Sequence, residues 1–383
     1  MPGLKDRLAD AGYGLGWSVV CRLPELWAQS AFRFSADLAW RRQGPGVQVL
    51  EGNLRRVIGS EASDAQLRAL SRQAMRSYAR YWLEAFRLPV MPAGRLVGGM
   101  RDTGHVRTAF EYLAAGRGVV FALPHMGNYD LAGAWVIAKG AGSITTVAER
   151  LKPESVYGRF VAFREGLGVE VLPASGGTGS AFGILAQRLR AGKLVCLVCD
   201  RDVTGSGIEV EFFGEKARMM GGAAALAVQT GAALMPVILW FEGDHWGVHI
   251  HEEIPVPAEG DSMHKAAAMM QQAARLFEAG IRAHPQDWHM LQRVFAADLD
   301  PGRLRRASAG SKSTYEAKRQ EGSGRLPRER QGTGSAATGG QRQISPRRPA
   351  PPERSERRSA ASWQLPKWRT RRAASGSVRG RSR

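Results

Sequence analysis

The chain has 383 residues and a formal net charge of +19, from 54 Lys and Arg against 35 Asp and Glu. The excess lies in residues 301–383, with 22 basic and 5 acidic side chains, whereas residues 1–300 carry 32 and 30. Three cysteines exclude a disulfide-stapled fold, and no run of about 18 apolar residues is present to span a membrane.

Residues 1–90 are predicted to be helical. After Pro24, which suits the first turn of a helix, apolar side chains recur at helical spacing at Leu23, Trp27, Ala31, Phe34 and Leu38. Basic side chains flank this stripe at Arg22, Arg33, Arg41 and Arg42. Two interpretations are open: a helix packed on the protein core, or an interfacial helix that lies on a membrane with aromatic anchors and basic flanks.

From Gly118 onward, short apolar runs alternate with helical patterns. Strands are predicted at 118–124, 143–148, 169–172, 194–199, 233–240 and 246–251, and helices at 128–139, 153–166, 179–191, 218–230 and 262–283. This alternation is typical of βαβ units. The predicted fold is therefore α/β, with a largely parallel or mixed central sheet flanked by helices, over residues 91–300 and in one domain with the N-terminal helices. Pro236 inside a predicted strand indicates a sheet edge or a bulge.

Residues 301–383 are rich in Arg, Ser, Gly and Pro and have no apolar periodicity, so they are predicted to form a disordered tail. Three interpretations of this tail are open: a polybasic arm for anionic lipid or nucleic acid, a solvated tail with no partner, or an out-of-frame extension of a GC-rich gene. Because the first 300 residues are nearly neutral, nucleic-acid binding is not expected to be the main function.

Two predicted strands end in ionisable residues. Segment 118–124 runs into His125, and segment 194–199 runs into Asp200, Arg201 and Asp202. Ligands of open α/β sheets bind beyond the carboxyl ends of the strands, so neighbouring strands would bring these residues to one rim. Asp130, in the first turn of the next helix, is a second carboxylate within reach of the histidine.

A carboxylate bonded to one imidazole nitrogen fixes the tautomer and leaves the other nitrogen free to accept a proton. The pattern around His125 therefore predicts a general base. The competing interpretation is a capped helix beside a structural histidine.

Other segments near this rim offer binding groups. Glu149 and Arg150 follow the second predicted strand and either line the rim or lie on the surface. The SGGTGS loop (175–180) precedes a helix, so Gly176 and Gly177 either present backbone amides to a phosphate or form a plain turn. The small-residue helix MMGGAAALAVQTGA (219–232) either packs closely on the sheet or lines an acyl tunnel.

No metal site and no bound cofactor are predicted. Cys196 and Cys199 lie three residues apart on a predicted strand, on opposite faces, which argues against a redox pair. His245, His249 and His251 share one strand face, but His245 and His249 would lie about 13 Å apart, too far to share one metal ion.

The sequence resembles the lysophospholipid-type acyltransferases, whose signature is His-x4-Asp or Glu after an apolar strand. It is most similar to the branch that contains lipid A lauroyl acyltransferases and phosphatidylinositol mannoside acyltransferases. The segments that carry the resemblance are ALPHMGNYDLAGAW, AERLKPESVYGRFVAFREGLGVEVLP, CDRDVTGSGIEVEFFGEKARMMGGAAALAVQTGAALMPV and DWHMLQRVFAADLD. With the N-terminal helices they cover residues 1–300, and the last of them favours the mannoside enzymes.

The resemblance implies transfer of a long acyl chain from acyl-CoA to a mannose hydroxyl of a phosphoinositol glycolipid. His125 would deprotonate this hydroxyl, with Asp200 or Asp130 as its partner, and typical general-base catalysis contributes about 10²–10⁴-fold. Arg164 matches a family arginine that is expected to face a phosphate of the acyl donor or acceptor, and the alternative is an arginine on a helix surface. Glu149, Arg150, Arg201 and Asp202 are expected to join it at the rim. The resemblance also implies a peripheral protein on the inner-membrane surface, at its cytoplasmic face.

Two alternatives accompany this function. The acceptor is a lipid A precursor or another glycolipid, since the resemblance specifies acyl transfer better than it specifies the sugar. In a different class, the chain binds nucleic acid or an anionic surface through its basic tail.

Overall fold

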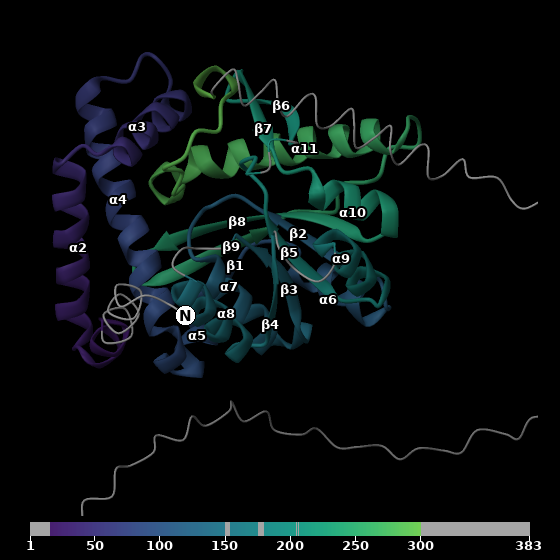
Figure 1. Cartoon of the computed structure of the whole chain (residues 1–383), viewed down its shortest axis with the longest axis horizontal. Helices are drawn as coiled ribbons and strands as arrows, with labels where there is room; N and C mark the ends of the chain where they lie inside the picture. The colour runs from purple at the N-terminus through teal and green to yellow at the C-terminus, as the bar shows by residue number, and fades with distance from the viewer. Residues whose placement is uncertain (1–15, 150–153, 175–179, 204, 206, 300–383) are drawn as a thin grey trace, which may run out of the picture. The chain divides into compact units, whose positions relative to one another are not determined.

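The computed structural model describes residues 16–149, 154–174, 180–203, 205 and 207–299. A seven-stranded sheet with the order β1-β9-β8-β2-β5-β3-β4 lies at its centre (Figure 1). The strands are β1 (Met100–Asp102), β2 (Val119–Leu123), β3 (Ile144–Ala148), β4 (Val169–Pro173), β5 (Leu194–Val198), β8 (Ala233–Glu242) and β9 (His245–Ile250). From β8 to β4 the neighbours run parallel, whereas β9 is antiparallel to β8. The predicted α/β fold with a largely parallel or mixed sheet is confirmed.

Helices cover both faces of this sheet. One face packs against α5 (Ala93–Gly99), α6 (Val106–Ala114), α7 (Tyr129–Val136) with its π-helical extension Ile137–Ala141, and α8 (Glu154–Gly166). The other face packs against α9 (Ala181–Arg190), α10 (Gly222–Thr230) and α11 (Ser262–Ala283) (Figure 1). Every residue of β2 is buried, which explains why its sequence VVFAL is apolar without alternation.

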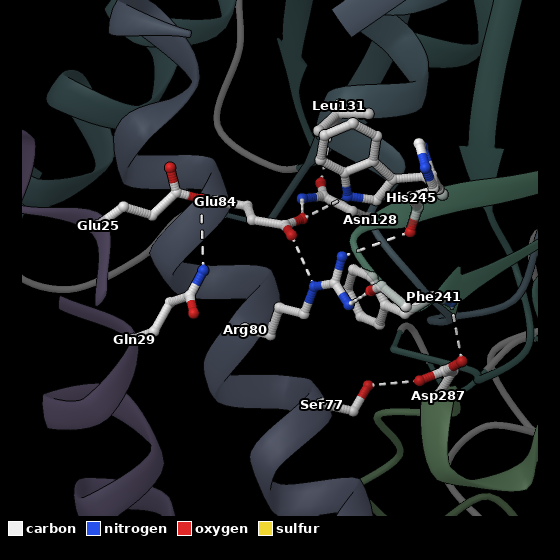
Figure 2. Close-up of polar contacts among 12 residues, drawn as sticks. Glu25, Gln29, Ser77, Arg80, Glu84, Asn128, Leu131, Phe241, His245 and Asp287 are labelled. Atoms are coloured by element: carbon white, nitrogen blue, oxygen red, sulfur yellow. Dashed lines mark hydrogen bonds and ion pairs between the residues drawn. The ribbon is translucent and has the colours of Figure 1, made fainter. Parts of the chain in front are cut away.

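The N-terminal part consists of α2 (Glu25–Arg41), α3 (Pro45–Ile58) and α4 (Asp64–Arg87). A capping box between Ser63 and Gln66 starts α4. Two side chains of α4 make polar contacts with the core: Arg80 is bonded to Glu84 at 2.7 Å within the helix (Figure 2), and it donates to the Gly243 carbonyl at 2.6 Å. Glu84 in turn accepts from the side chains of Asn128 and Trp246. The contact between α4 and the sheet therefore includes polar bonds, most of them partly buried.

Helix α2 packs on α4 through Ala28 and Ala36, which are buried. Its predicted apolar stripe points the other way, since Trp27, Phe34 and Leu38 are 36–72% exposed. The interpretation of this stripe as a core-facing surface is therefore wrong. Asp37 lies between Arg72 and Arg76 of α4, and hydrogen bonds from these two arginines hold the pKa of its carboxyl well below the usual value.

Pro236 does not mark a sheet edge, because β8 lies between β9 and β2. Residues 233–236 of β8 pair with β2, and residues 237–242 pair with β9. Proline lacks a backbone N–H, and it sits where β8 changes from one partner strand to the other. Its carbonyl still accepts from the His251 N–H at 2.8 Å.

The sequence did not predict β1 or the hairpin of β6 (Ile208–Phe212) and β7 (Glu215–Met219). The helix predicted from residue 218 begins instead at Gly222, because β7 extends to Met219. The hairpin turn has Phe213 at φ 52° and Gly214 at φ 78°. Asn-Gly or Asp-Gly is the usual signal for such a turn, and Phe-Gly does not resemble it.

No helix within the described ranges is long and apolar enough to cross a membrane. Arg150, Gly176, Gly177 and the predicted tail 301–383 lie outside the described residues. The division of the chain at residues 90 and 300 stays a prediction.

Candidate active site

The site lies where β2 and β5 end. These parallel neighbours are paired in register from Val119 and Leu194 to Leu123 and Val198. His125 and Asp200 each follow two residues after the last pair, so the sheet itself brings them together. The two side chains therefore meet at the carboxyl ends of their strands, as predicted.

His125 and Asp200 form a hydrogen-bonded pair. Nδ1 of His125 lies 2.5 Å from Oδ1 of Asp200, and the backbone N–H of His125 donates to Oδ2 at 2.9 Å. Asp200 is fully buried, whereas the His125 side chain is 24% exposed. Since a carboxylate only accepts hydrogen bonds, the proton between them belongs to Nδ1, and Nε2 of His125 is left free to accept one.

Trp288 completes the environment of Asp200. Its indole N–H donates to Oδ2 at 2.9 Å, and its side chain is fully buried. Burial alone raises the pKa of the Asp200 carboxyl, but the interactions with His125 and Trp288 outweigh it and hold the pKa below the usual value. The carboxylate is therefore charged and hydrogen-bonded at both oxygens.

Asp130 is bonded elsewhere. Arg164 donates to it from Nε at 2.7 Å and from Nη2 at 3.2 Å, and the Tyr81 hydroxyl donates at 2.8 Å. The charge of Asp130 raises the pKa of the Arg164 guanidinium, and burial raises the pKa of Tyr81. Of the two candidate carboxylates, Asp200 contacts His125 and Asp130 fixes Arg164.

These groups face a cavity of about 510 Å³. His125, Arg164 and Arg201 line it, but most of its wall is apolar. One part of the wall comes from the α7 and α8 side of the sheet, including Phe121, Leu123, Ala132, Gly133, Phe160 and Val161. Another part comes from the opposite side, including Leu185, Leu197, Cys199, Met220, Ala223 and Leu226. The small-residue helix α10 thus packs in the core through Ala224 and Ala227 and also lines the cavity through Ala223 and Leu226; that this cavity holds an acyl chain stays a prediction.

At the rim, Arg201 donates to Glu149 at 3.0 Å. Nε of Arg201 is buried and has no hydrogen-bond partner within the described part of the chain. Asp202 accepts from the backbone N–H groups of Gly205 and Gly207, both at 2.8 Å, and therefore shapes the loop that follows β5.

Sequence reasoning missed the role of the segment after α11. Its residues 287–289 run antiparallel to 125–127: the N–H of His289 donates to the His125 carbonyl at 2.8 Å, and the N–H of Gly127 donates to the Asp287 carbonyl at 2.9 Å. Trp288 and His289 reach the site through this pairing. No local pattern signals it, because the paired segments lie about 160 residues apart.

The remaining candidates do not form sites. Cys196 packs on one face of the sheet and Cys199 on the other, and burial raises the pKa of the Cys196 thiol to about 12. Among the described residues, no group of three or more His, Cys, Asp or Glu side chains is arranged to hold a metal ion. The rings of His249 and His251 are in contact, with centroids 4.4 Å apart.

Comparison with known proteins gives a consistent result. The profile of the family described as bacterial lipid A biosynthesis acyltransferase matches residues 8–297. A phosphatidylinositol mannoside acyltransferase of Mycolicibacterium smegmatis is 48% identical over 303 residues, which cover 79% of this chain and 96% of that protein. Two proteins of the same name from Mycobacterium tuberculosis strains are each 46% identical over 301 residues, covering 77% of this chain and 90% of theirs. The chain therefore belongs to the bacterial lipid A biosynthesis acyltransferase family.

Proposed function

We propose that this protein transfers a long acyl chain from acyl-CoA to a mannose hydroxyl of a phosphatidylinositol mannoside, with His125 as general base. The names of its relatives support the acceptor. The observation that supports this reaction is the His125–Asp200 pair, with His125 at the wall of a mostly apolar cavity. No bound cofactor takes part, and acyl-CoA is a co-substrate.

The reaction needs one proton acceptor and no protein nucleophile. Nε2 of His125 removes the proton of the sugar hydroxyl while its oxygen attacks the thioester carbonyl. The carbon–sulfur bond then breaks, and the thiolate of CoA leaves with the proton returned by the imidazolium. Asp200 holds the tautomer of His125 and stabilises the imidazolium while it exists.

Two arginines are suited to bind phosphate groups of the substrates. Arg164 is held rigidly by Asp130, and Arg201 carries a buried N–H without a partner in the described residues. Glu149 accepts from Nη2 of Arg201 at 3.0 Å and so helps to orient it. Arg150 and the glycines at 176 and 177 remain proposed contacts, and Asp202 contributes by shaping the loop beside Arg201.

The apolar wall of the cavity is suited to the acyl chain. Its volume of about 510 Å³ falls in the usual range for small-molecule sites, roughly 300–1,000 Å³. Hydrocarbon burial contributes about 0.8 kcal/mol per CH₂ group, so a chain of palmitoyl length gains much of its affinity there.

The exposed stripe of α2 supports a peripheral location at the cytoplasmic face of the membrane. Trp27 and Phe34 are 72% and 66% exposed, and Arg33 and Arg41 lie on the same helix. Exposed aromatic side chains with basic neighbours are typical of helices that lie in an anionic membrane surface. Both the glycolipid acceptor and its product would be reached from there.

The test measures free CoA released from palmitoyl-CoA, with and without purified phosphatidylinositol mannosides. The wild type is expected to release CoA faster with the mannoside, and His125→Ala is expected to abolish this gain. His245→Ala, an exposed histidine outside the site, is the matched control. If a lipid A precursor stimulates release and the mannoside does not, the acceptor proposed here is wrong. If His125→Ala retains the activity, the mechanism is wrong.

A further inference from the structure

His289 is a second imidazole of the catalytic cavity, and nothing in the acyl-transfer mechanism above uses it. It is only 6% exposed and lines the same cavity as His125. Its backbone N–H is bonded to the His125 carbonyl, so the two histidines are fixed relative to each other. Rings of Tyr78, Tyr81 and Phe241 surround it at centroid distances of 5.4–6.3 Å.

A short chain of hydrogen bonds holds the ring of His289. Nε2 lies 2.8 Å from the Ser77 hydroxyl, which lies 2.6 Å from Oδ1 of Asp287. Asp287 also accepts from the backbone N–H of Phe241 at 3.0 Å, and Figure 2 shows Asp287 between Ser77 and Phe241. The side chains of His289, Ser77 and Asp287 are all at least nine-tenths buried.

The hydrogen bonds among His289, Ser77 and Asp287 allow one consistent arrangement of protons at neutral pH. Burial raises the pKa of Asp287 only to about 6, so its carboxylate is ionised and can only accept; the Ser77 proton therefore points to Asp287. Burial lowers the pKa of His289 to about 3, so the ring is neutral. With the Ser77 proton used, Nε2 of His289 must carry the ring proton and donate to Ser77, which leaves Nδ1 as an acceptor.

Nδ1 of His289 has no hydrogen-bond partner among the residues that the structure describes, and it is not one of the fully enclosed polar atoms there. A bare acceptor beside the base needs a ligand that donates. The hydrocarbon chain, the thioester and ionised phosphates have no such donor, whereas a sugar hydroxyl and the amide N–H groups of CoA do. The test below separates these two donors by which substrate the variants affect.

We propose that His289 binds the acceptor sugar by accepting, through Nδ1, a hydrogen bond from a hydroxyl adjacent to the one that His125 deprotonates. This inference rests on the proposed glycolipid acceptor. Ser77 and Asp287 are positioning residues, since they fix which nitrogen of His289 is the acceptor. The site would then select an acceptor that carries at least two neighbouring hydroxyls over a simple alcohol.

The test compares two variants that each keep half of the imidazole. In His289→Gln the amide reaches the position of Nε2 and Ser77, but no acceptor remains at Nδ1. In His289→Asn the amide oxygen takes the position of Nδ1, but the link to Ser77 is lost. Transfer from palmitoyl-CoA is measured with a phosphatidylinositol mannoside and with its monodeoxy analogues.

For His289→Gln, kcat/KM for the full acceptor is expected to fall about three- to tenfold, the usual effect of one neutral hydrogen bond. One deoxy analogue should lower the wild-type kcat/KM by the same factor and should not lower that of His289→Gln further. His289→Asn should still discriminate against this analogue. The effect should appear with the mannoside varied, with KM for palmitoyl-CoA unchanged.

Two results for His289→Gln would overturn the inference. One is an equal loss of kcat/KM on the full acceptor and on all its deoxy analogues. The other is a raised KM for palmitoyl-CoA alone, which would point to an amide of CoA as the donor. Failure of the wild type to use any mannoside would overturn the proposed function as well. If the variants do not fold, a measurement on the wild type tests the inference instead. Long-range ¹H–¹⁵N NMR of histidine-labelled protein should show the ring proton of His289 on Nε2. A proton on Nδ1 would contradict the inference.

Discussion

The indole N–H of Trp288 donates to the same oxygen of Asp200 that accepts the backbone N–H of His125. Trp288 and Asp200 are 88 positions apart, and both are fully buried. Trp288 therefore fixes the carboxylate on which the orientation of His125 depends.

Trp288→Phe keeps the aromatic ring and removes this donor. A hydrogen bond to a charged group contributes about 1.5–3 kcal/mol, so kcat for CoA release is expected to fall about ten- to a hundredfold. Trp246→Phe removes a buried indole bond to Glu84 outside the site and serves as the control. Equal activity losses in the two variants would show that Trp288 acts only through stability.

Asp130→Asn and Asp200→Asn are expected to differ in kind. Asp130→Asn leaves the buried Arg164 guanidinium without its charge partner, which typically costs 3–5 kcal/mol of stability. It should lower the urea midpoint strongly and raise the KM for the substrate whose phosphate Arg164 is proposed to bind. Asp200→Asn should instead reduce kcat, because the His125 tautomer is no longer fixed. The same phenotype in both variants would contradict this division of roles.

The pH dependence of the unfolding free energy at acidic pH should change in the Asp287→Asn variant. In the folded state the pKa of Asp287 is raised to about 6 by burial, so between the unfolded value near 3.8 and 6 its ionisation lowers stability as pH rises. For His289 the folded pKa is lowered to about 3, so its contribution to stability is present above about 6.5 and is lost as pH falls towards 3.

These two slopes oppose each other between about pH 4 and 6. Asp287→Asn removes one of them, so its unfolding free energy should rise with pH more steeply than that of the wild type, by up to about 1.4 kcal/mol per pH unit. Urea unfolding at several pH values measures the difference, with the exposed Asp244→Asn as control. Parallel curves would show that Asp287 is not protonated in the folded protein.

The stripe on α2 predicts how the protein binds membranes. Replacing Trp27 and Phe34 by Ser removes two large exposed side chains, each of which contributes about 1.5–3 kcal/mol when fully buried. Sedimentation with phosphatidylinositol-containing vesicles should show at least tenfold weaker binding, without loss of thermal stability. Met263→Ser, at an exposed apolar residue of α11, should bind as the wild type does. Unchanged binding of the double variant would place the membrane contact elsewhere.

Gly133 lies on α7 against the cavity, and a Cβ atom there would meet only Cδ1 of Ile144 at an ordinary 3.8 Å. Gly133→Leu should therefore fold, and its side chain should fill part of the cavity. The preferred donor is expected to change from palmitoyl-CoA to a shorter acyl-CoA. Gly158→Leu on α8, where a Cβ meets nothing within 4 Å and which does not line the cavity, is the control. An unchanged preference would mean that the chain binds another part of the cavity.

Much of the fold was readable because its strands are buried on both faces and its helices are amphipathic. It was also predictable that His125 and Asp200 could meet at one rim, since both residues follow apolar strands and the carboxyl ends of parallel neighbours meet. The choice between Asp200 and Asp130 was not, because it depends on which strand neighbours β2 and on where Arg164 lies. Trp288 and His289 reach the site through pairing between distant segments, which no local period encodes. The direction of the α2 stripe was equally hidden, since an apolar helix face looks the same towards a core or a membrane.

The pairing of residues 287–289 with 125–127 also has a consequence for synthesis on the ribosome. At roughly 5–20 residues per second, Trp288 is made about 4–18 s after Asp200. Until then the nascent chain contains His125 and Asp200 but neither the indole of Trp288 nor the imidazole of His289. The site is therefore complete only after residues 287–289 have been made, and fragments that stop before residue 288 are expected to be inactive even though they hold His125 and Asp200.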